Sequence, residues 1–150
     1  MTITYQRERH SDTLCAELLP LLRANWRESP SYEVGLDVDP DFPRYAQLDQ
    51  ADVLLCFTAR QGEELIGYVI YIVTPSRRHR TVLCGYGEAL YLKPDFRGHA
   101  PELLRTAHTA LIKRGVSRLG WMVNEGSTLH QLLVACGFYP DEIMMEKKLS

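Results

Sequence analysis

Apolar residues recur along the start of the chain first at strand spacing and then at helix spacing. Ile3–Arg9 alternates loosely between apolar and polar residues, which predicts a first strand. From a cap at Ser11 or Asp12 the spacing becomes helical up to about Arg27. Pro20 lies in the middle of this helix and predicts that the helix either bends or breaks there.

The later segments continue the alternation of helices and strands. Their predicted bounds are Phe42–Gln50 (helix), Val53–Arg60, Leu65–Thr74 and Val82–Lys93 (strands), Pro101–Arg114 (helix), Ser117–Asn124 (strand), Ser127 or Thr128 to Gly137 (helix) and Phe138–Leu149 (a final hairpin or bent strand). The turn at Gln61–Glu64 makes its flanking strands a hairpin, and the helix before Ser117 connects a parallel pair. The pattern predicts an α/β fold with a mixed, mostly antiparallel central sheet flanked by helices, in one domain spanning residues 1–150.

The stretch Gly87–Leu104 combines the end of a strand, a short loop and the start of a helix. Pro94 ends the strand, because proline has no N–H to donate to a ladder. A loop with a glycine and a cation follows, and Pro101 suits the first turn of the next helix, where its missing N–H costs no bond. Free backbone N–H groups and the positive end of the helix dipole meet at this loop, which predicts a phosphate-binding site.

Residues Pro94–Gly98 read PDFRG and match the opening of a known cofactor motif, P-x-(F/Y)-R-G-x-G-x-G. At these residues the sequence resembles the GCN5-related N-acetyltransferases (GNAT), and the order of elements is similar over nearly the whole chain. The core of the motif falls on Arg97–Glu102, where Ala100 and Glu102 depart from the small or glycine residues of the family. The local residue pattern is most similar to a branch that phages and prophages often carry.

The resemblance implies acetyl-coenzyme A (acetyl-CoA) as the cofactor, bound where the sheet splays open at the motif strand. Its pyrophosphate is expected on the backbone N–H groups of Gly98, His99, Ala100 and Glu102, with Arg97 adding positive charge at the rim. The carboxylate of Glu102 would repel a nearby pyrophosphate by about 1–4 kcal/mol at a surface-like dielectric. These two departures from the motif weaken the expected binding without abolishing it.

The resemblance also places the pantetheine arm of the cofactor. In the family this arm pairs like a strand with the end of the motif strand, which implicates the main chain of Leu90, Tyr91 and Leu92 and the groove beside Ser117–Asn124. Asn124 matches a polar residue that the family often has at the start of the following segment. The alternative role of Asn124 is to bend the chain out of the strand.

Acetyl transfer to an amine needs a group that takes up the proton of the amine, because an amine with the pKa of lysine is protonated at neutral pH. Glu88 on the motif strand is the candidate general base, and the alternative is a sheet-edge carboxylate or one paired with an arginine. By resemblance, the backbone N–H of Leu92 donates to the thioester carbonyl. The tyrosine that often protonates the leaving thiolate in the family falls on Leu133, so the sequence lacks this general acid.

Acidic residues gather in the irregular region between Glu28 and Asp52, where Arg44 is the one basic residue. One interpretation is a solvated loop with turn-forming aspartates. The other is an acidic wall that attracts a cationic amine, since this region usually forms one side of the acceptor site in the resembled family. We therefore expect the acceptor to be a primary amine, either a small cationic molecule or a lysine or peptide amine.

The charge and composition of the chain narrow the classes of partner that it is expected to bind. The formal net charge of −2 and the pI of about 6.2 argue against a general nucleic-acid binder. The basic run Arg77–Arg80 is interpreted first as a solvated hairpin tip, and the alternative is a nucleic-acid or protein interaction module. No apolar run approaches the ~20 residues of a membrane helix, and the polar N-terminus does not resemble a signal peptide, so we expect a cytoplasmic protein without a membrane partner.

Two further expectations concern the cysteines and the assembly. The four cysteines lie far apart and have no metal-ligand spacing, so they predict reduced core residues and no metal site: Cys15, Cys56, Cys84 and Cys136. The last hairpin could pair between subunits, which leaves a homodimer open. A non-catalytic member of the same fold, with weak or no coenzyme A binding, is the alternative to an enzyme.

Overall fold

The computed structural model describes residues 2–149, which fall into two compact units that divide between Gly120 and Trp121. The first unit is built on a sheet with the spatial order β1-β2-β3-β4-β5. The strands are β1 (Ile3–Glu8), β2 (Leu54–Gln61), β3 (Glu64–Pro75), β4 (Leu83–Leu92) and β5 (Val116–Trp121). The first four strands are antiparallel, each to the next.

The pair β4 and β5 is parallel, and β4 is the longer of the two. The Ser117 hydroxyl donates to the carbonyl oxygen of Leu83 (3.5 Å), and the backbone of Gly120 lies against the Tyr86 ring. The contacting positions rise together along both strands, which is the mark of a parallel pair. Because β5 ends one residue after Gly120, the second half of β4, from Glu88 on, extends past the end of β5. The predicted mixed sheet with a splayed strand pair is therefore confirmed.

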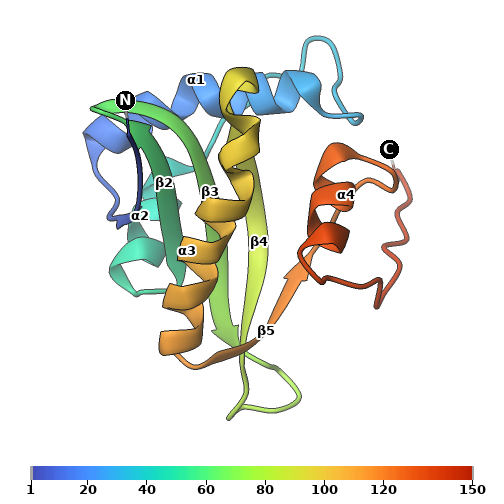
Figure 1. Ribbon diagram of the computed structural model, residues 1–150. Coiled ribbons are helices and arrows are strands. Elements are labelled where there is room, and N and C mark those ends of the chain that lie inside the picture. The colour runs from blue at the N-terminus through green and yellow to red at the C-terminus, as the bar shows by residue number, and fades with distance from the viewer. Residues whose placement is uncertain (1, 150) are drawn as a thin grey trace. The chain divides into compact units, whose positions relative to one another are not determined.

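Helices cover both faces of this sheet (Figure 1). They are α1 (Asp12–Glu28) and α2 (Phe42–Gln50) on one face and α3 (Ala100–Lys113) on the other. Ser11 caps α1 by accepting the Leu14 N–H (3.0 Å), and α1 continues through Pro20 as one helix, so the predicted break is excluded. Among residues 2–149, no helix has the length and apolar character that crossing a membrane requires.

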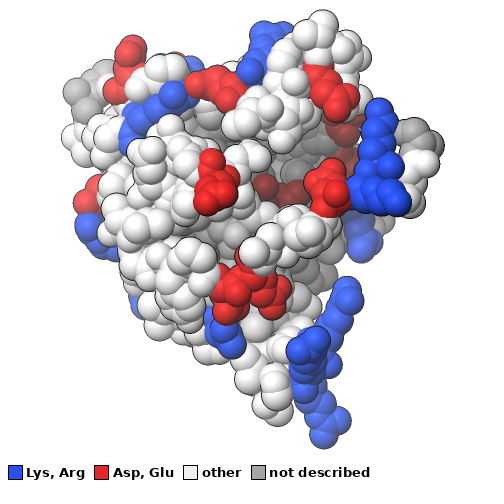
Figure 2. Space-filling view, turned by 90° about the vertical axis from the view of Figure 1, so that its right-hand side faces the viewer, with Lys and Arg blue, Asp and Glu red and all other residues white. Residues whose placement is uncertain are grey.

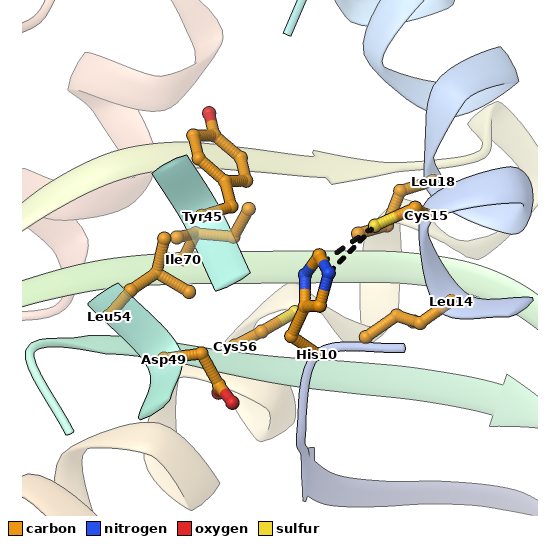
Figure 3. Close-up of a pocket in the computed structure, with 9 residues that line it drawn as sticks. All are labelled: His10, Leu14, Cys15, Leu18, Tyr45, Asp49, Leu54, Cys56 and Ile70. Atoms are coloured by element: carbon orange, nitrogen blue, oxygen red, sulfur yellow. Dashed lines mark hydrogen bonds between the residues drawn. The ribbon is translucent and has the colours of Figure 1, made fainter. Parts of the chain in front are cut away.

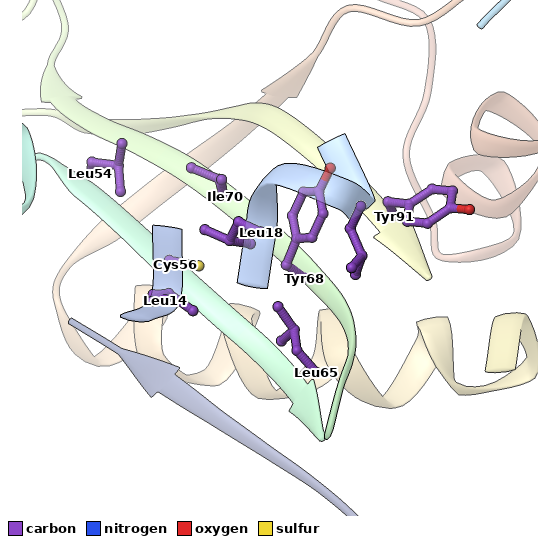
Figure 4. Close-up of a cluster of buried hydrophobic side chains, with 9 residues drawn as sticks. Leu14, Leu18, Leu54, Cys56, Leu65, Tyr68, Ile70 and Tyr91 are labelled. Atoms are coloured by element: carbon purple, nitrogen blue, oxygen red, sulfur yellow. The ribbon is translucent and has the colours of Figure 1, made fainter. Parts of the chain in front are cut away.

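The core between α1 and the sheet follows from the helical spacing of α1. Its buried leucines pack on side chains that β2, β3 and β4 direct to the same face (Figure 4), and together the cluster includes Leu14, Leu18, Leu21, Leu54, Cys56, Leu65, Tyr68, Ile70 and Tyr91. Burying one large apolar side chain stabilises a fold by about 1.5–3 kcal/mol. This cluster therefore fixes α1 against the second half of β4.

Three local predictions were wrong. The expected loop at Phe96–Ala100 is largely a 3-10 helix, η1 (Pro94–His99), which continues directly into α3. Phe138–Leu149 contains no strand, and most of its side chains are exposed. Cys136 is exposed rather than buried in a core, while Cys56 and Cys84 are buried and all four thiols are free.

The second unit contains one helix among its described residues, α4 (Thr128–Ala135). Ser127 caps this helix by accepting the His130 N–H (3.1 Å), and Asn124 accepts the Ser127 N–H just before it (3.0 Å). Gly137 ends the helix with a φ of +93°, and Leu133, the position of the family tyrosine, is buried. Asn124 therefore belongs to the turn before α4 and not to β5.

Candidate active site

Strand β4 carries a β-bulge at Glu88. Ile70 pairs with Ala89 and Tyr71 pairs with Gly87, so Glu88 is an extra residue with no partner opposite it in β3. A bulge bends its strand and redirects the side chain of the extra residue. The Glu88 side chain is exposed although the residue lies inside a sheet strand. The bulge is the local feature that brings a strand carboxylate to the solvent.

The pKa of Tyr45 on α2 indicates where Glu88 lies. Burial, followed by the negative charges of Glu88 and Asp41, raises the pKa of Tyr45 above its ordinary value of 10.0. Glu88 is therefore near enough to Tyr45 to act on it electrostatically, and Ala89, the next residue of β4, packs against the core under α1. The candidate base and the acidic region between α1 and α2 are therefore on the same side of the sheet.

The second half of β4 directs alternate main-chain groups toward its open edge. Lys93 donates its N–H to the carbonyl of Ile66, which lies opposite it in β3 (2.9 Å). In an antiparallel pair, such hydrogen-bonded positions alternate with positions whose N–H and C=O groups point outward. Leu92 and Leu90 therefore point outward, beyond the end of β5. Tyr91 falls on a position that bonds to β3, so its main chain is less suited to the cofactor than the sequence predicted.

Two side chains that contact this open edge support that orientation. The Asn25 amide of α1 donates to the carbonyl oxygen of Leu90 (3.5 Å), and Arg97 Nε donates to the carbonyl oxygen of Leu92 (3.3 Å). Both carbonyls thus face away from β3. The N–H of Leu92 points to the same edge, where the sequence predicts that it donates to a carbonyl.

The 3-10 helix η1 leads from this edge to the start of α3. The N-cap residue His99 makes no side-chain capping bond, and Pro101 has no N–H, so Glu102 is the first residue after Pro101 with a backbone N–H. A Cβ added to Gly98 would meet no atom within 4 Å, so the turn is open there. The Ala100 N–H already donates to the Arg97 carbonyl in the 3-10 turn. Fewer donors face a phosphate here than the sequence predicted.

Arg97 is already engaged by three neighbours. Its Nη2 forms an ion pair with Glu28 of α1, its Nε bonds to Leu92, and its guanidinium carbon lies 5.6 Å from the centre of the Tyr91 ring. Burial raises the pKa of Glu28, but hydrogen bonds from Arg97 and Tyr91 outweigh burial and hold this pKa below its ordinary value. Glu28 is therefore charged at neutral pH.

The remaining residues of the predicted phosphate turn contact other parts of the chain. His99 Nδ1 lies 2.8 Å from the Tyr5 hydroxyl of β1. Glu102 forms an exposed ion pair with Arg105, one helical turn further on (2.6 Å). The carboxylate of Glu102 therefore extends along the helix surface, which reduces the repulsion of a phosphate at the helix start.

Sequence reasoning missed Asn25, and it assigned Glu28 to the acidic region between α1 and α2 and not to a pair with Arg97. Both lie in the last turns of α1, three residues apart, and so on one side of the helix. The available signal was weak: two polar side chains continue the helical face that the buried leucines Leu18 and Leu21 begin. A contact with a strand more than sixty residues away cannot be seen in that spacing.

Two hollows lie beside these elements. The smaller is a cavity of about 20 Å³ among His10, Cys15, Tyr45, Asp49 and other residues (Figure 3), which is room for about one water molecule. The larger is a groove of about 350 Å³ between α1 and the ends of β3 and β4, lined by Glu17, Pro20, Leu21, Ala24, Glu64, Leu65, Tyr91 and Lys93. The groove meets the candidate site at Tyr91, and the small cavity contains none of the predicted site residues.

Charges are unevenly spread over the face drawn in Figure 2. Acidic side chains are spread over its middle, and a group of basic side chains lies at its lower tip. The β3–β4 loop, at the lower end of Figure 1, carries the exposed Arg77, Arg78 and Arg80. This basic loop lies at the opposite end of β4 from the phosphate turn.

Comparisons with known proteins agree with this geometry. The sequence matches the model of one family, described as the acetyltransferase (GNAT) family, over residues 15–139. No curated protein matches the sequence significantly.

Many solved structures share the fold. An aminoglycoside acetyltransferase from an uncultured soil metagenomic sample, in complex with sisomicin, aligns with a TM-score of 0.78 at 12% identity over 99% of this chain and 97% of that chain. A predicted acetyltransferase with acetyl-CoA from Clostridium acetobutylicum aligns with a TM-score of 0.74 at 18% identity over 99% of this chain and 97% of that chain. The ribosomal-protein-alanine N-acetyltransferase of Brucella melitensis biovar Abortus 2308 aligns with a TM-score of 0.72 at 18% identity over 99% of this chain and 100% of that chain. At these identities the likeness shows the fold.

Proposed function

Because the chain belongs to the acetyltransferase (GNAT) family, whose members are N-acetyltransferases that use acetyl-CoA, we propose that it moves the acetyl group directly to a primary amine. The observation that carries the proposal is the open edge of β4. Leu90 and Leu92 point their main-chain groups past the end of β5, and the 3-10 helix η1 leads from there to the start of α3, which has no side-chain cap. Glu88 lies on the same strand, four residues before Leu92.

The residues at this edge fit the cofactor. Glu102 offers a backbone N–H and α3 the positive end of its dipole to a pyrophosphate, and Gly98 leaves room for it. The main-chain N–H groups of Leu90 and Leu92 would hold the pantetheine arm, while their carbonyl oxygens already accept from Asn25 and Arg97. Acetyl-CoA, when bound, supplies an acetyl thioester. Arg97 belongs to the same site but is engaged by Glu28.

Glu88 is the proposed general base. An amine acceptor must lose a proton to become a nucleophile, and a carboxylate can accept it directly or through a water molecule. Glu88 is exposed on the bulge and faces α2, so an acceptor that arrives between α1, α2 and β4 can reach it. The Leu92 N–H would stabilise the negative charge that develops on the acetyl oxygen. With Leu133 at the tyrosine position, we propose that the thiolate leaves without a protein acid.

The acceptor is proposed to be cationic. The segment between α1 and α2 carries the exposed carboxylates of Glu33, Asp37 and Asp39, next to the face that Glu88 serves. An aminoglycoside and a ribosomal protein are acceptors named for two proteins of the same fold. For this chain we propose a small polyamine-like or aminosugar acceptor first and a lysine or peptide amine second.

The competing function is a non-catalytic protein with the same fold. The pairing of Arg97 with Glu28 and the buried Leu133 favour it, because both remove groups that the family uses. The test is release of coenzyme A thiol from acetyl-CoA, measured with a panel of polyamines, aminoglycosides and lysine peptides. Release that depends on an amine and falls in Glu88→Gln supports the enzyme. A folded protein that binds acetyl-CoA weakly or not at all and releases no thiol with any amine supports the non-catalytic alternative.

A further inference from the structure

The cations around the phosphate turn are all matched with carboxylates. The three ion pairs are Lys93 with Glu64 (2.6 Å), Arg97 with Glu28, and Arg105 with Glu102 (2.6 Å). A turn that binds a pyrophosphate needs positive charge to offset the charge of the ligand. Each positive side chain of this turn, as the structure describes it, has a partner within the chain that competes with the ligand.

The pair of Arg97 and Glu28 differs from the other two. Lys93 pairs with a carboxylate of the neighbouring strand β3, and Arg105 pairs with one that lies one helical turn away. Glu28, by contrast, comes from α1, 69 residues before Arg97. Glu28 is also the last residue of α1, where the segment toward α2 begins. This ion pair therefore joins the phosphate turn to the acceptor side of the sheet.

The geometry of Arg97 makes the competition direct. Its Nε is committed to the Leu92 carbonyl (3.3 Å), and its Nη2 to Glu28. The guanidinium is thereby drawn back over Tyr91, whose ring centre lies 5.6 Å away. An arginine recognises phosphate with the same N–H groups that recognise a carboxylate. A pyrophosphate at the turn and Glu28 therefore compete for the charge and the orientation of one guanidinium, although its Nη1 has two further N–H groups.

We propose that Glu28 is an internal competitor for Arg97 that the pyrophosphate of coenzyme A displaces, so that Glu28 sets the affinity for the cofactor. The inference rests on the proposed function. In the absence of cofactor, Glu28 holds Arg97 against β4 and balances its positive charge. When the cofactor binds, Arg97 exchanges one anionic partner for another, and Glu28 is released together with the end of α1.

An ordinary surface ion pair would have no such effect. Both side chains of the pair are nearly half exposed, 45% for Arg97 and 43% for Glu28, and exposed pairs contribute little to stability. The two interpretations predict different changes in the affinity for coenzyme A when the charge of Glu28 is removed. Removing the charge of Glu28 strengthens cofactor binding if Glu28 competes, and leaves binding unchanged or weaker if the pair only supports the turn.

Calorimetric titration of coenzyme A into the purified full chain separates these cases. Glu28→Gln keeps the size of the side chain and removes its charge, and it should lower the Kd for coenzyme A about fivefold. Glu63→Gln removes the same charge from the exposed β2–β3 turn and should change Kd less than twofold if the effect is local. In an Arg97→Gln background, Glu28→Gln should have no effect, because the competed group is gone.

Each result decides a different point. Equal or weaker binding by Glu28→Gln than by the unmodified chain overturns the inference while the cofactor site stands. The same gain in the Arg97→Gln background shows a general charge effect and also overturns it. Binding by Glu28→Gln alone supports it most strongly. If neither protein binds coenzyme A, the proposed function fails and the inference fails with it.

Discussion

The side-chain amide of Asn25 on α1 donates to the main-chain oxygen of Leu90 on β4, 65 residues further along the chain. The same amide nitrogen lies 3.3 Å from the hydroxyl oxygen of Tyr68 in β3, which is fully buried. One side chain thus connects a helix to two strands at the point where β4 passes the end of β5. Asn25 therefore fixes the open edge of β4 from the side of α1.

Replacing Asn25 with alanine should loosen that edge. Loss of the two hydrogen bonds should lower the free energy of unfolding by about 1 kcal/mol, measured by urea denaturation. The KM for acetyl-CoA should rise, because the Leu90 main chain is then less well fixed. Arg27→Ala, an exposed change on the same helix, is the control. Equal behaviour of the two variants would show that Asn25 has no special role.

Gly67 should not tolerate a side chain. A Cβ at Gly67 would lie 2.7 Å from Leu92 Cγ and 3.0 Å from the Tyr91 carbonyl oxygen, so Leu92 would have to move. We expect Gly67→Ala to destabilise the chain by about 1–3 kcal/mol. Gly98→Ala is the matched control for stability, since a Cβ there meets nothing within 4 Å. A thermal melt that leaves Gly67→Ala as stable as Gly98→Ala contradicts the close packing of β3 on β4.

Glu88→Gln should remove catalysis and leave the fold intact. Glu88 is exposed on a bulge, so its neutral analogue should unfold at the same temperature as the unmodified chain. If Glu88 is the base, kcat should fall by about 10²–10⁴-fold with KM for acetyl-CoA little changed. A kcat within twofold of the unmodified enzyme would assign the proton to another acceptor.

The ion pairs of Arg60 predict a pH dependence of stability. Burial raises the pKa of Glu8, but hydrogen bonds from Arg60 and Thr58 outweigh it, so this pKa lies below the ordinary 4.5. A carboxyl with a depressed pKa in the folded state stabilises it above the unfolded pKa, and the contribution is lost as pH falls through the folded value. Glu8→Gln should therefore be less stable than the unmodified chain at pH 7. The difference should shrink below about pH 4.5, and a difference that is constant with pH would contradict this.

The sequence was most informative where periodicity decides the structure. The bounds of α2 are the predicted Phe42–Gln50, and the cap of α1 is one of the two predicted residues, Ser11. Turn chemistry and helical spacing are local, so they can be found in a short window. The last segment, Phe138–Leu149, has an apolar pattern but no strand in the structure, and most of its side chains are exposed. A strand is stabilised by its pairing partner, and a pattern within one short segment does not show whether that partner is reached.

The candidate site was harder to predict because its geometry comes from long-range contacts. Arg97 was expected at the rim of a phosphate site, and nothing near it in the sequence indicates that Glu28 of α1 engages it. Leu90 and Leu92 were expected at the cofactor edge from resemblance, and the alternation of the β3–β4 ladder supports that role while assigning Tyr91 to the opposite side. The bulge at Glu88 depends on the register of two strands, which one strand alone cannot show.

Titration of acetyl-CoA into the purified chain by calorimetry shows whether the open edge of β4 is a cofactor site. We predict saturable binding of one cofactor per chain with a micromolar Kd, retained in Glu88→Gln because that change affects proton transfer and not the cofactor edge. Absence of binding up to millimolar acetyl-CoA, in a protein that melts cooperatively, would contradict the proposed cofactor site. It would leave a GNAT fold whose open strand edge serves a different ligand.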